Sequence, residues 1–98
     1  MKRSRSETII DLHLENLEYN KAGLSIQDIL HIQLDHCQKF LEHSIVKGHD
    51  KIVIIHGVGK GTLKKEIAKI LKTHPNVESF QDASVVEFGL GATEVFLK

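Results

Sequence analysis

An apolar run followed at once by closely spaced glycines constrains the fold more than any other feature of this 98-residue sequence. Residues 51–55 read KIVII, and residues 56–64 read HGVGKGTLK. A run that is apolar at nearly every position is typical of a strand that is buried on both sides or central in its sheet. Beyond the glycines, apolar residues recur at helical spacing from Leu63 to Leu71, and Pro75 follows. The stretch therefore predicts a strand, a glycine loop and a helix that begins at Thr62.

The rest of the chain predicts one more helix and three more strands. Ser25 and Asp28 have the spacing of a capping box, and an apolar stripe with helical period follows them as far as Gly48. Residues 15–24 have no period and are expected to form a connecting loop. Short β-branched runs predict strands at residues 8–12, 77–83 and 94–97. The order βαβαββ predicts a two-layer α/β sandwich, in which a four-stranded mixed sheet packs against two helices.

Composition excludes several classes of protein. Only 5% of the residues are aromatic and Trp is absent, which argues against an aromatic platform for stacked bases. Cys37 is the one cysteine and lies on the apolar stripe, so we expect a buried thiol and no internal disulfide. No apolar run approaches the length of about 20 residues that a membrane span needs. We expect a monomeric cytoplasmic protein, with a basic, flexible tail at residues 1–7 and one domain at residues 8–98.

Charge is distributed unevenly although the formal net charge is zero. Residues 51–74 carry six lysines and one acid, so the glycine loop and the helix after it form the most positive part of the chain. The loop is neither a P-loop nor a dinucleotide fingerprint, because Lys60 lies between glycines and Thr62 stands where a third glycine belongs. Closely spaced glycines at a helix N-terminus allow backbone amides to bind an anion. They also suit a tight turn that needs positive φ, and the lysines also suit a solvated helix face.

Two histidines and one aspartate come where the first two predicted strands end. Asp11 and His13 are two residues apart, so on a strand they share a face. His56 follows the second strand, and it emerges at the same carboxyl edge if the two strands are parallel neighbours. Such a set suits in-line attack on a phosphodiester. It offers a base for the nucleophile, an acid for the leaving oxygen, and amides and lysine for the charged phosphate.

Three motifs in this order resemble the Smr (small MutS-related) domain. They are DLH at residues 11–13, HGVGKGTLK at residues 56–64 and GLGATEVFL at residues 89–97. The usual signatures are DLHG, HGxGxGxLR and a final G-G-A-T run, so Leu14 replaces a glycine and Lys64 replaces an arginine. The resemblance covers residues 9–97 and implies the βαβαββ sandwich. It also implies a nuclease or nucleic-acid-binding module, with nicking of DNA in bacterial repair and recombination proteins and cleavage of messenger RNA in eukaryotic relatives.

Residues and resemblance together predict a weak endonuclease acting on DNA or RNA. The expected catalytic residues are Asp11, His13 and His56, and the expected phosphate contacts are Gly57, Gly59, Lys60, Gly61 and Lys64. The alternative is a non-catalytic nucleic-acid-binding module of a larger protein. No structural metal site is expected, because the remaining histidines lack a third convergent ligand. A Mg²⁺ ion held loosely by Asp11 and a substrate phosphate stays open.

Overall fold

The computed structural model describes residues 8–17 and 23–98, so the predicted tail at residues 1–7 lies outside the described residues. Its elements, in chain order, are β1 (Ile9–Asp11), the 3-10 helix η2 (Leu14–Asn16), α1 (Ile26–Val46), β2 (Lys51–Ile55), α2 (Thr62–Thr73), β3 (Val77–Asp82), α3 (Val85–Phe88) and β4 (Ala92–Leu97). None of the helices in the described ranges is long and apolar enough to cross a membrane.

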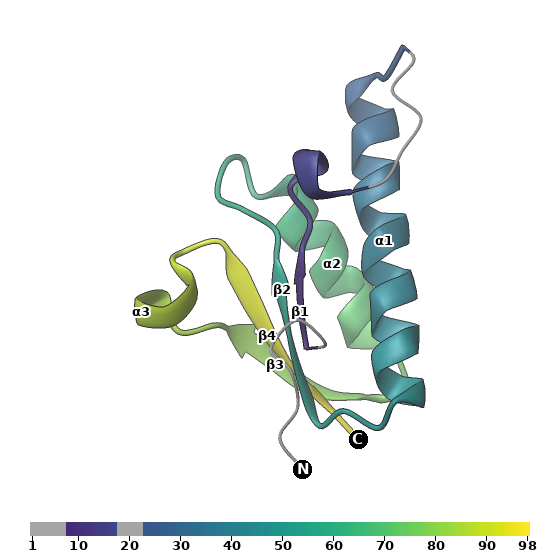
Figure 1. The fold of residues 1–98 in the computed structure, drawn as a ribbon, viewed down its shortest axis with the longest axis vertical. Coiled ribbons are helices and arrows are strands. Elements are labelled where there is room, and N and C mark those ends of the chain that lie inside the picture. Colours follow the sequence, from purple (N-terminus) through teal and green to yellow (C-terminus); the bar gives the residue numbers. More distant parts are fainter. Residues whose placement is uncertain (1–7, 18–22) are drawn as a thin grey trace.

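The four strands form one mixed sheet in the order β1-β2-β4-β3. β1 and β2 are parallel, whereas β4 runs antiparallel to both of its neighbours. The helices α1 and α2 lie side by side on one face of this sheet, and α3 projects on the other side (Figure 1). This arrangement confirms the predicted α/β sandwich. It also confirms that β1 and β2 are parallel neighbours, which is the condition for a site at their shared carboxyl edge.

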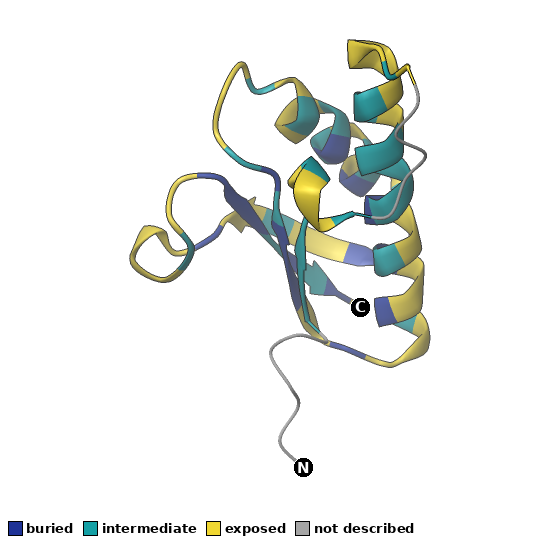
Figure 2. Ribbon diagram, turned by 45° about the horizontal axis from the view of Figure 1, so that its top comes forward, coloured by how far each residue is buried: buried dark blue, intermediate teal, exposed yellow. Residues whose placement is uncertain are grey.

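The core explains why residues 51–55 carry so little polarity. Ile52, Val53 and Ile54 are all buried, because β2 is covered on both faces. Ile52 and Ile54 belong to the main cluster between the sheet and the two long helices, together with Cys37. Val53 belongs to a smaller cluster on the opposite face. Figure 2 shows the buried residues concentrated on the strands and on the sides of the helices that face them.

The predicted start and end of α1 are confirmed. The Ser25 hydroxyl accepts a hydrogen bond from the Asp28 backbone N–H at 3.1 Å, and the Asp28 carboxylate accepts one from the Ser25 backbone N–H at 3.0 Å. This is a capping box, and it satisfies two amides that the helix itself leaves unpaired. Gly48, just beyond the helix, has a φ of +76° that other residues rarely adopt.

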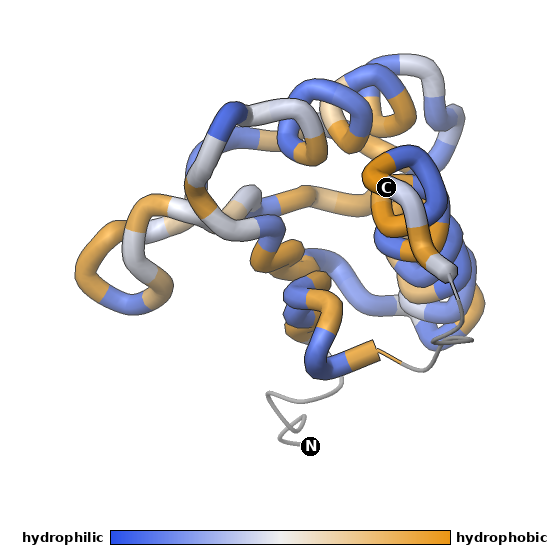
Figure 3. The backbone as a smooth tube through the Cα atoms, turned by 90° about the horizontal axis from the view of Figure 1, so that it is seen from above, coloured by the Kyte–Doolittle hydropathy of each residue, from blue (hydrophilic) through white to orange (hydrophobic). Residues whose placement is uncertain are grey.

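Two short helices and the bounds of three strands differ from the sequence expectation. β1 spans Ile9–Asp11 instead of residues 8–12, and β3 spans Val77–Asp82 instead of residues 77–83. η2 and α3 were not predicted, because elements of three and four residues carry no readable period. β4 begins at Ala92 rather than at residue 94. Val85 and Val86 of α3 are exposed, while Phe88 packs back against the small cluster around Val53. Seen from above, α3 is a hydrophobic tip that stands away from the rest of the molecule (Figure 3).

Candidate functional site

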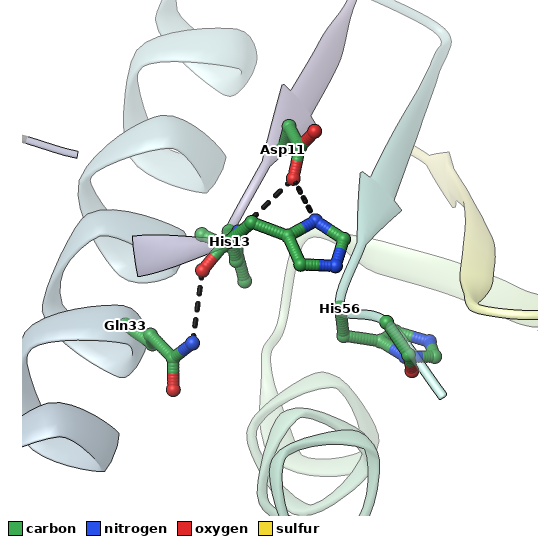
Figure 4. Close-up of polar contacts among 6 residues, drawn as sticks. Asp11, His13, Gln33 and His56 are labelled. Carbon is green, nitrogen blue, oxygen red and sulfur yellow. Dashed lines mark hydrogen bonds and ion pairs between the residues drawn. The ribbon is translucent and has the colours of Figure 1, made fainter. Parts of the chain in front are cut away.

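The carboxyl ends of β1 and β2 meet at one edge of the sheet. Asp11 pairs with Ile55 in the parallel ladder, and the Leu12 N–H donates to the Ile55 carbonyl at 2.8 Å. β1 then continues into η2 and β2 into the glycine loop. The Gln33 side-chain amide donates to the Leu12 carbonyl at 2.9 Å and so ties this edge to α1 (Figure 4). The backbone that carries His13 is therefore held from two sides.

Asp11 and His13 form a hydrogen-bonded pair at this edge. Asp11 Oδ1 accepts the His13 backbone N–H at 3.0 Å and the ring Nδ1 at 2.6 Å. A carboxylate only accepts hydrogen bonds, so the proton of the neutral imidazole sits on Nδ1 and Nε2 keeps a lone pair. Partial burial on its own would raise the pKa of the Asp11 carboxyl, but hydrogen bonds from His13 and Asn16 outweigh burial and lower it. The carboxylate is thus ionised at neutral pH and orients the ring.

The free edge of the His13 ring faces Gly57. A Cβ at Gly57 would lie 3.0 Å from His13 Nε2, and the φ of Gly57 is +82°, so the position has two reasons to be glycine. On the other side, a Cβ at Gly91 would lie 2.5 Å from the Gly57 carbonyl carbon. The Gly91 carbonyl also accepts the backbone N–H groups of His56 at 2.9 Å and Gly57 at 3.0 Å. Gly57 is therefore enclosed between the imidazole and the backbone of Gly91.

His56 emerges at the same edge but on the other face of the sheet. In the β1–β2 register, Asp11 shares a face with Ile55 and with the small cluster that contains Ile9. His56 follows the opposite alternation and lies on the face covered by the long helices, where its Nε2 contacts Thr93 Oγ1 at 2.8 Å. The structure thus brings Asp11, His13 and Gly57 together and directs the His56 ring toward β4.

Both ring nitrogens of His56 have partners. Nδ1 lies 3.0 Å from the Gly57 carbonyl, which only accepts, so Nδ1 carries the proton and Nε2 accepts from the Thr93 hydroxyl. Burial lowers the pKa of the His56 ring, the bond to the Gly57 carbonyl raises it, Lys64 lowers it and Asp82 raises it, with a net lowering. The ring is therefore neutral at pH 7. It joins the end of β2 to β4 and fixes the carbonyl of Gly57.

The glycine loop leads directly into α2. Gly59 and Gly61 have φ of +112° and +81° with open space where a Cβ would stand, so each is required for its backbone conformation rather than for a close contact. Gly61 is the N-cap of α2 and makes no side-chain cap. The first N–H groups of the helix consequently have no side-chain acceptor at the cap, and the helix dipole adds favourable potential for an anion.

The two lysines of the loop differ in their surroundings. Lys60 is exposed and has no ion-pair partner within the ranges that the structure describes. Lys64 Nζ lies 2.8 Å from the Asp82 carboxylate, so its charge is partly neutralised by β3. Hydrogen bonding and charge from Lys64 lower the pKa of Asp82, which keeps this surface pair ionised. Lys60 is therefore the freer of the two cations for an incoming anion.

Gln33 and Thr93 support the site and were not singled out by sequence reasoning. Gln33 lies on α1, and its contact with Leu12 spans 21 residues of sequence, so no local pattern signals it. Thr93 belongs to the GLGATEVFL stretch that carries the family resemblance. The motif itself was the available signal for a role of Thr93. Thr93 turns out to be the hydrogen-bond partner of His56.

Metal-binding capacity at this edge rests on Asp11. Across residues 8–17 and 23–98, no group of three or more His, Cys, Asp or Glu side chains is arranged to hold a metal ion. Asp11 Oδ1 already accepts two hydrogen bonds from His13, and the Asn16 side chain also bonds to this carboxylate, so little of its capacity as a ligand is left. One carboxylate oxygen together with substrate phosphate oxygens is a loose site for Mg²⁺.

Fold and site define the class of this protein. It is a small α/β-sandwich domain with an Asp–His pair and a glycine loop at the carboxyl edge of its two parallel strands. Comparison with known families gives the particular identity: the chain belongs to the Smr domain family, whose model matches residues 30–98. The matched range contains His56 and the glycine loop and begins after Asp11 and His13.

Relatives and solved structures agree with this assignment. The chain is 34% identical over 88 residues to the Endonuclease MutS2 of Halalkalibacterium halodurans, covering 90% of this chain and 10% of that protein. With the Endonuclease MutS2 of Finegoldia magna it is 36% identical over 81 residues, covering 83% and 10%. The chain thus spans about a tenth of the length of these relatives.

Among solved structures, the Smr domain of Thermus thermophilus MutS2 superposes with a TM-score of 0.66 at 30% identity, covering 93% of this chain and 98% of that one. YdaL, a stand-alone small MutS-related protein from Escherichia coli, superposes with a TM-score of 0.68 at 17% identity, covering 94% and 65%. The second likeness is one of fold alone.

Proposed function

We propose that this Smr domain binds nucleic acid and cleaves phosphodiester bonds, with His13 as the group that transfers the proton. One observation carries the proposal: the Asp11 carboxylate holds His13 Nδ1 at 2.6 Å, so the ring presents Nε2 beside Gly57, where the glycine loop begins. The MutS2 relatives are named endonucleases, which supports the same reaction class.

The proposed reaction is an in-line displacement at phosphorus. A water molecule attacks the phosphorus while His13 Nε2 takes its proton, and the bond from phosphorus to the leaving oxygen breaks. The leaving oxygen departs on the side opposite the attacking water and takes a proton from solvent, and the His13 imidazolium afterwards returns its proton to solvent. Asp11 stabilises the imidazolium, because its ionised carboxylate already bonds to Nδ1. Amides of the loop and the charge of Lys60 stabilise the additional negative charge on the phosphate oxygens.

His56 is proposed to position the loop rather than to touch the substrate. Its Nδ1–H holds the Gly57 carbonyl, and its Nε2 accepts the Thr93 hydroxyl, so neither nitrogen is available to a substrate without loss of one of these bonds. A direct catalytic role for His56 would require the bond to Thr93 to open. His56→Gln tests the difference, because a positioning residue changes KM and stability along with kcat, while a proton-transfer residue changes kcat and its pH profile.

Cleavage assays on single-stranded and duplex DNA and RNA test the enzyme directly. His13→Gln is expected to lower the rate by about 10²–10⁴-fold, the usual contribution of a positioned acid–base group. Asp11→Asn should lower it as well, because the neutral amide no longer stabilises an imidazolium. His31→Gln is the control, since His31 is an exposed histidine on α1. Equal product traces from the wild type and His13→Gln would assign the activity to a contaminant and refute the mechanism.

The phosphate contacts are proposed to be the amides of Gly59 and Gly61 and the side chains of Lys60 and Lys64. The expected contact through the Gly57 amide is not proposed, because this N–H already donates to the Gly91 carbonyl. Salt dependence measures them, because each neutralised phosphate adds a fixed slope to a plot of log affinity against log salt. Replacing both lysines by alanine should flatten that slope by about two units. Lys72→Ala, in the last turn of α2, is the control and should change the slope less. A slope that responds only to Lys72 would place the bound strand on the outer face of the helix.

A non-catalytic binding module is the second candidate. It is favoured by the occupied ring of His56 and by the Lys64–Asp82 pair, both of which reduce the groups free for chemistry. Under this alternative, Asp11→Asn and the wild type bind equally well and neither cleaves. Loss of cleavage with unchanged binding in Asp11→Asn supports the enzyme instead.

The wider setting is proposed from the family. The domain acts on DNA in repair or recombination, or on RNA in its turnover, as a cytoplasmic monomer. Mg²⁺ is the proposed cofactor. Asp11 would hold it loosely together with the substrate, and the ion would neutralise charge on the phosphate. Cleavage that persists in EDTA would assign the reaction to His13 and Asp11 without a divalent ion.

A further inference from the structure

A groove opens between the first turns of α1 and the glycine loop. It has a volume of about 220 Å³ and two unlike walls. Ile26, Ile29 and Leu30 of α1 form an apolar wall, and the loop from Gly57 to Lys64 forms the other. Gly57 is shared with the Asp11–His13 pair, because His13 Nε2 faces it from the opposite side. The groove therefore ends at the backbone that the candidate catalytic histidine contacts.

The apolar wall belongs to neither hydrophobic cluster of the protein. Ile26, Ile29 and Leu30 are absent from both clusters, and Ile26 is 86% exposed. The apolar stripe of α1 thus continues past the core into its first two turns, where no described element covers it. Ile26 is exposed, and Ile29 and Leu30 are half-buried. Aliphatic side chains that face a cationic wall across a groove suit a ligand with one apolar part and one anionic part.

Gln33 of α1 lines the same groove and adds a polar side chain to it. Its Nε2 donates one hydrogen bond to the Leu12 carbonyl, which fixes the orientation of the side-chain amide. Among residues 8–17 and 23–98, this bond to Leu12 is the one found for the Gln33 side chain, whose amide also offers an oxygen and a second N–H. An oriented amide of this kind pairs with the edge of a nucleobase, whose hydrogen-bonding groups are free only when the base is unpaired.

We infer that the groove holds one unpaired nucleotide, with its base on the Ile26–Ile29–Leu30 wall, its phosphate on the glycine loop and its base edge at Gln33. This inference rests on the proposed function and specifies its substrate: a single-stranded or locally opened nucleic acid rather than an intact duplex. In a duplex, the neighbouring bases cover both faces of a base, and its partner occupies its pairing edge. Such a base can contact neither the apolar wall nor Gln33. Contact with an apolar wall is tolerant of base identity, because every base has an apolar face.

Binding of a fluorescent oligonucleotide, measured by anisotropy, tests the inference. The full chain should bind a single strand more tightly than the same sequence as a duplex. An Ile26→Asn, Ile29→Asn double variant should lose about tenfold in affinity for the single strand, because partial burial of two aliphatic side chains against a base is worth about 1–2 kcal/mol. Val46→Asn is the matched control, since Val46 lies at the other end of α1 and is 86% exposed, as Ile26 is. It should bind as the wild type does.

Further measurements keep the two proposals distinguishable. Loss of binding to every nucleic acid tested overturns the proposed function and this inference together. A preference for the duplex in binding or cleavage overturns the inference alone. The same holds if the double variant Ile26→Asn, Ile29→Asn binds the single strand as well as the control Val46→Asn does. Thermal unfolding supplies a check on the wall itself. Polar substitution of the exposed Ile26 and the half-buried Ile29 should cost only a modest part of the stability if no other segment packs on them. A large loss in the double variant would mean that the chain covers the wall, and would overturn the inference.

Discussion

Adding a methyl group at Gly91 would force apart the backbone segments that support the candidate site. An alanine Cβ there would lie 2.5 Å from the carbonyl carbon of Gly57 and 2.6 Å from its Cα. Gly91 has no positive φ, so the contact alone decides the effect. Gly57 cannot retreat freely, because its other side faces His13 Nε2. The strands must therefore separate at this point or the side chain of His13 must move.

The expected cost follows from two terms. Overpacking of a close contact costs about 1–3 kcal/mol, and here the obstacle is backbone, which yields least. Displacement weakens the two hydrogen bonds that the Gly91 carbonyl accepts from His56 and Gly57, each worth about 0.5–1.5 kcal/mol. We expect Gly91→Ala to lose about 3 kcal/mol, and at about 4–8 °C per kcal/mol for a domain of this size Tm should fall by about 15 °C.

Urea and thermal unfolding measure this loss, and Gly48→Ala provides the comparison. Gly48 has φ of +76° and nothing within 4 Å of an added Cβ, so alanine there carries only the backbone strain of about 1–2 kcal/mol. A loss in Gly91→Ala that does not exceed the loss in Gly48→Ala would refute the close contact between Gly91 and Gly57. NMR of the His13 ring should show a changed environment in Gly91→Ala and an unchanged one in Gly48→Ala.

Three further predictions concern ionisable side chains. The folded state holds the pKa of His56 below its unfolded value of about 6.5, so the unfolded chain binds more protons and stability falls as pH falls through that value. His56→Asn should flatten this decline in urea midpoints between about pH 7 and 5; an equal decline in both proteins would contradict it. Asp82→Asn releases Lys64 and should tighten nucleic-acid binding a few-fold at low salt, with no gain at high salt. No gain at low salt would remove Lys64 from the phosphate contacts. Burial raises the pKa of the Cys37 thiol to about 12, so a thiol reagent should label it only as fast as the protein unfolds.

Sequence patterns located the elements that position the site because each pattern had a local physical cause. The spacing of Ser25 and Asp28 predicts a cap, and the apolar residues 52–55 predict a central strand. Parallel pairing of β1 and β2 followed from the intervening helix. That pairing was sufficient to place Asp11 and His13 at the edge where the glycine loop begins.

Only the structure could show on which face of the sheet the His56 side chain lies. Alternation reveals a side chain's face only when one face of a strand is polar, and β1 and β2 are apolar on both faces. The sequence therefore indicated which edge His56 occupies and not which side. The Lys64–Asp82 pair is similarly hidden, because it joins residues 18 positions apart through a contact between α2 and β3.

β1 is an edge strand of three residues, and this position makes its end of the site locally less stable than the rest of the sheet. It pairs with β2 on one side, and the hydrogen bond from Gln33 anchors its end to α1. Short edge strands open locally at a lower free energy than the central strands beside them. Native-state hydrogen exchange should accordingly find the β1 amides exchanging faster than those of β2. Asp11 and His13 would leave Gly57 together in such an opening, while the rest of the sheet and the glycine loop remain folded.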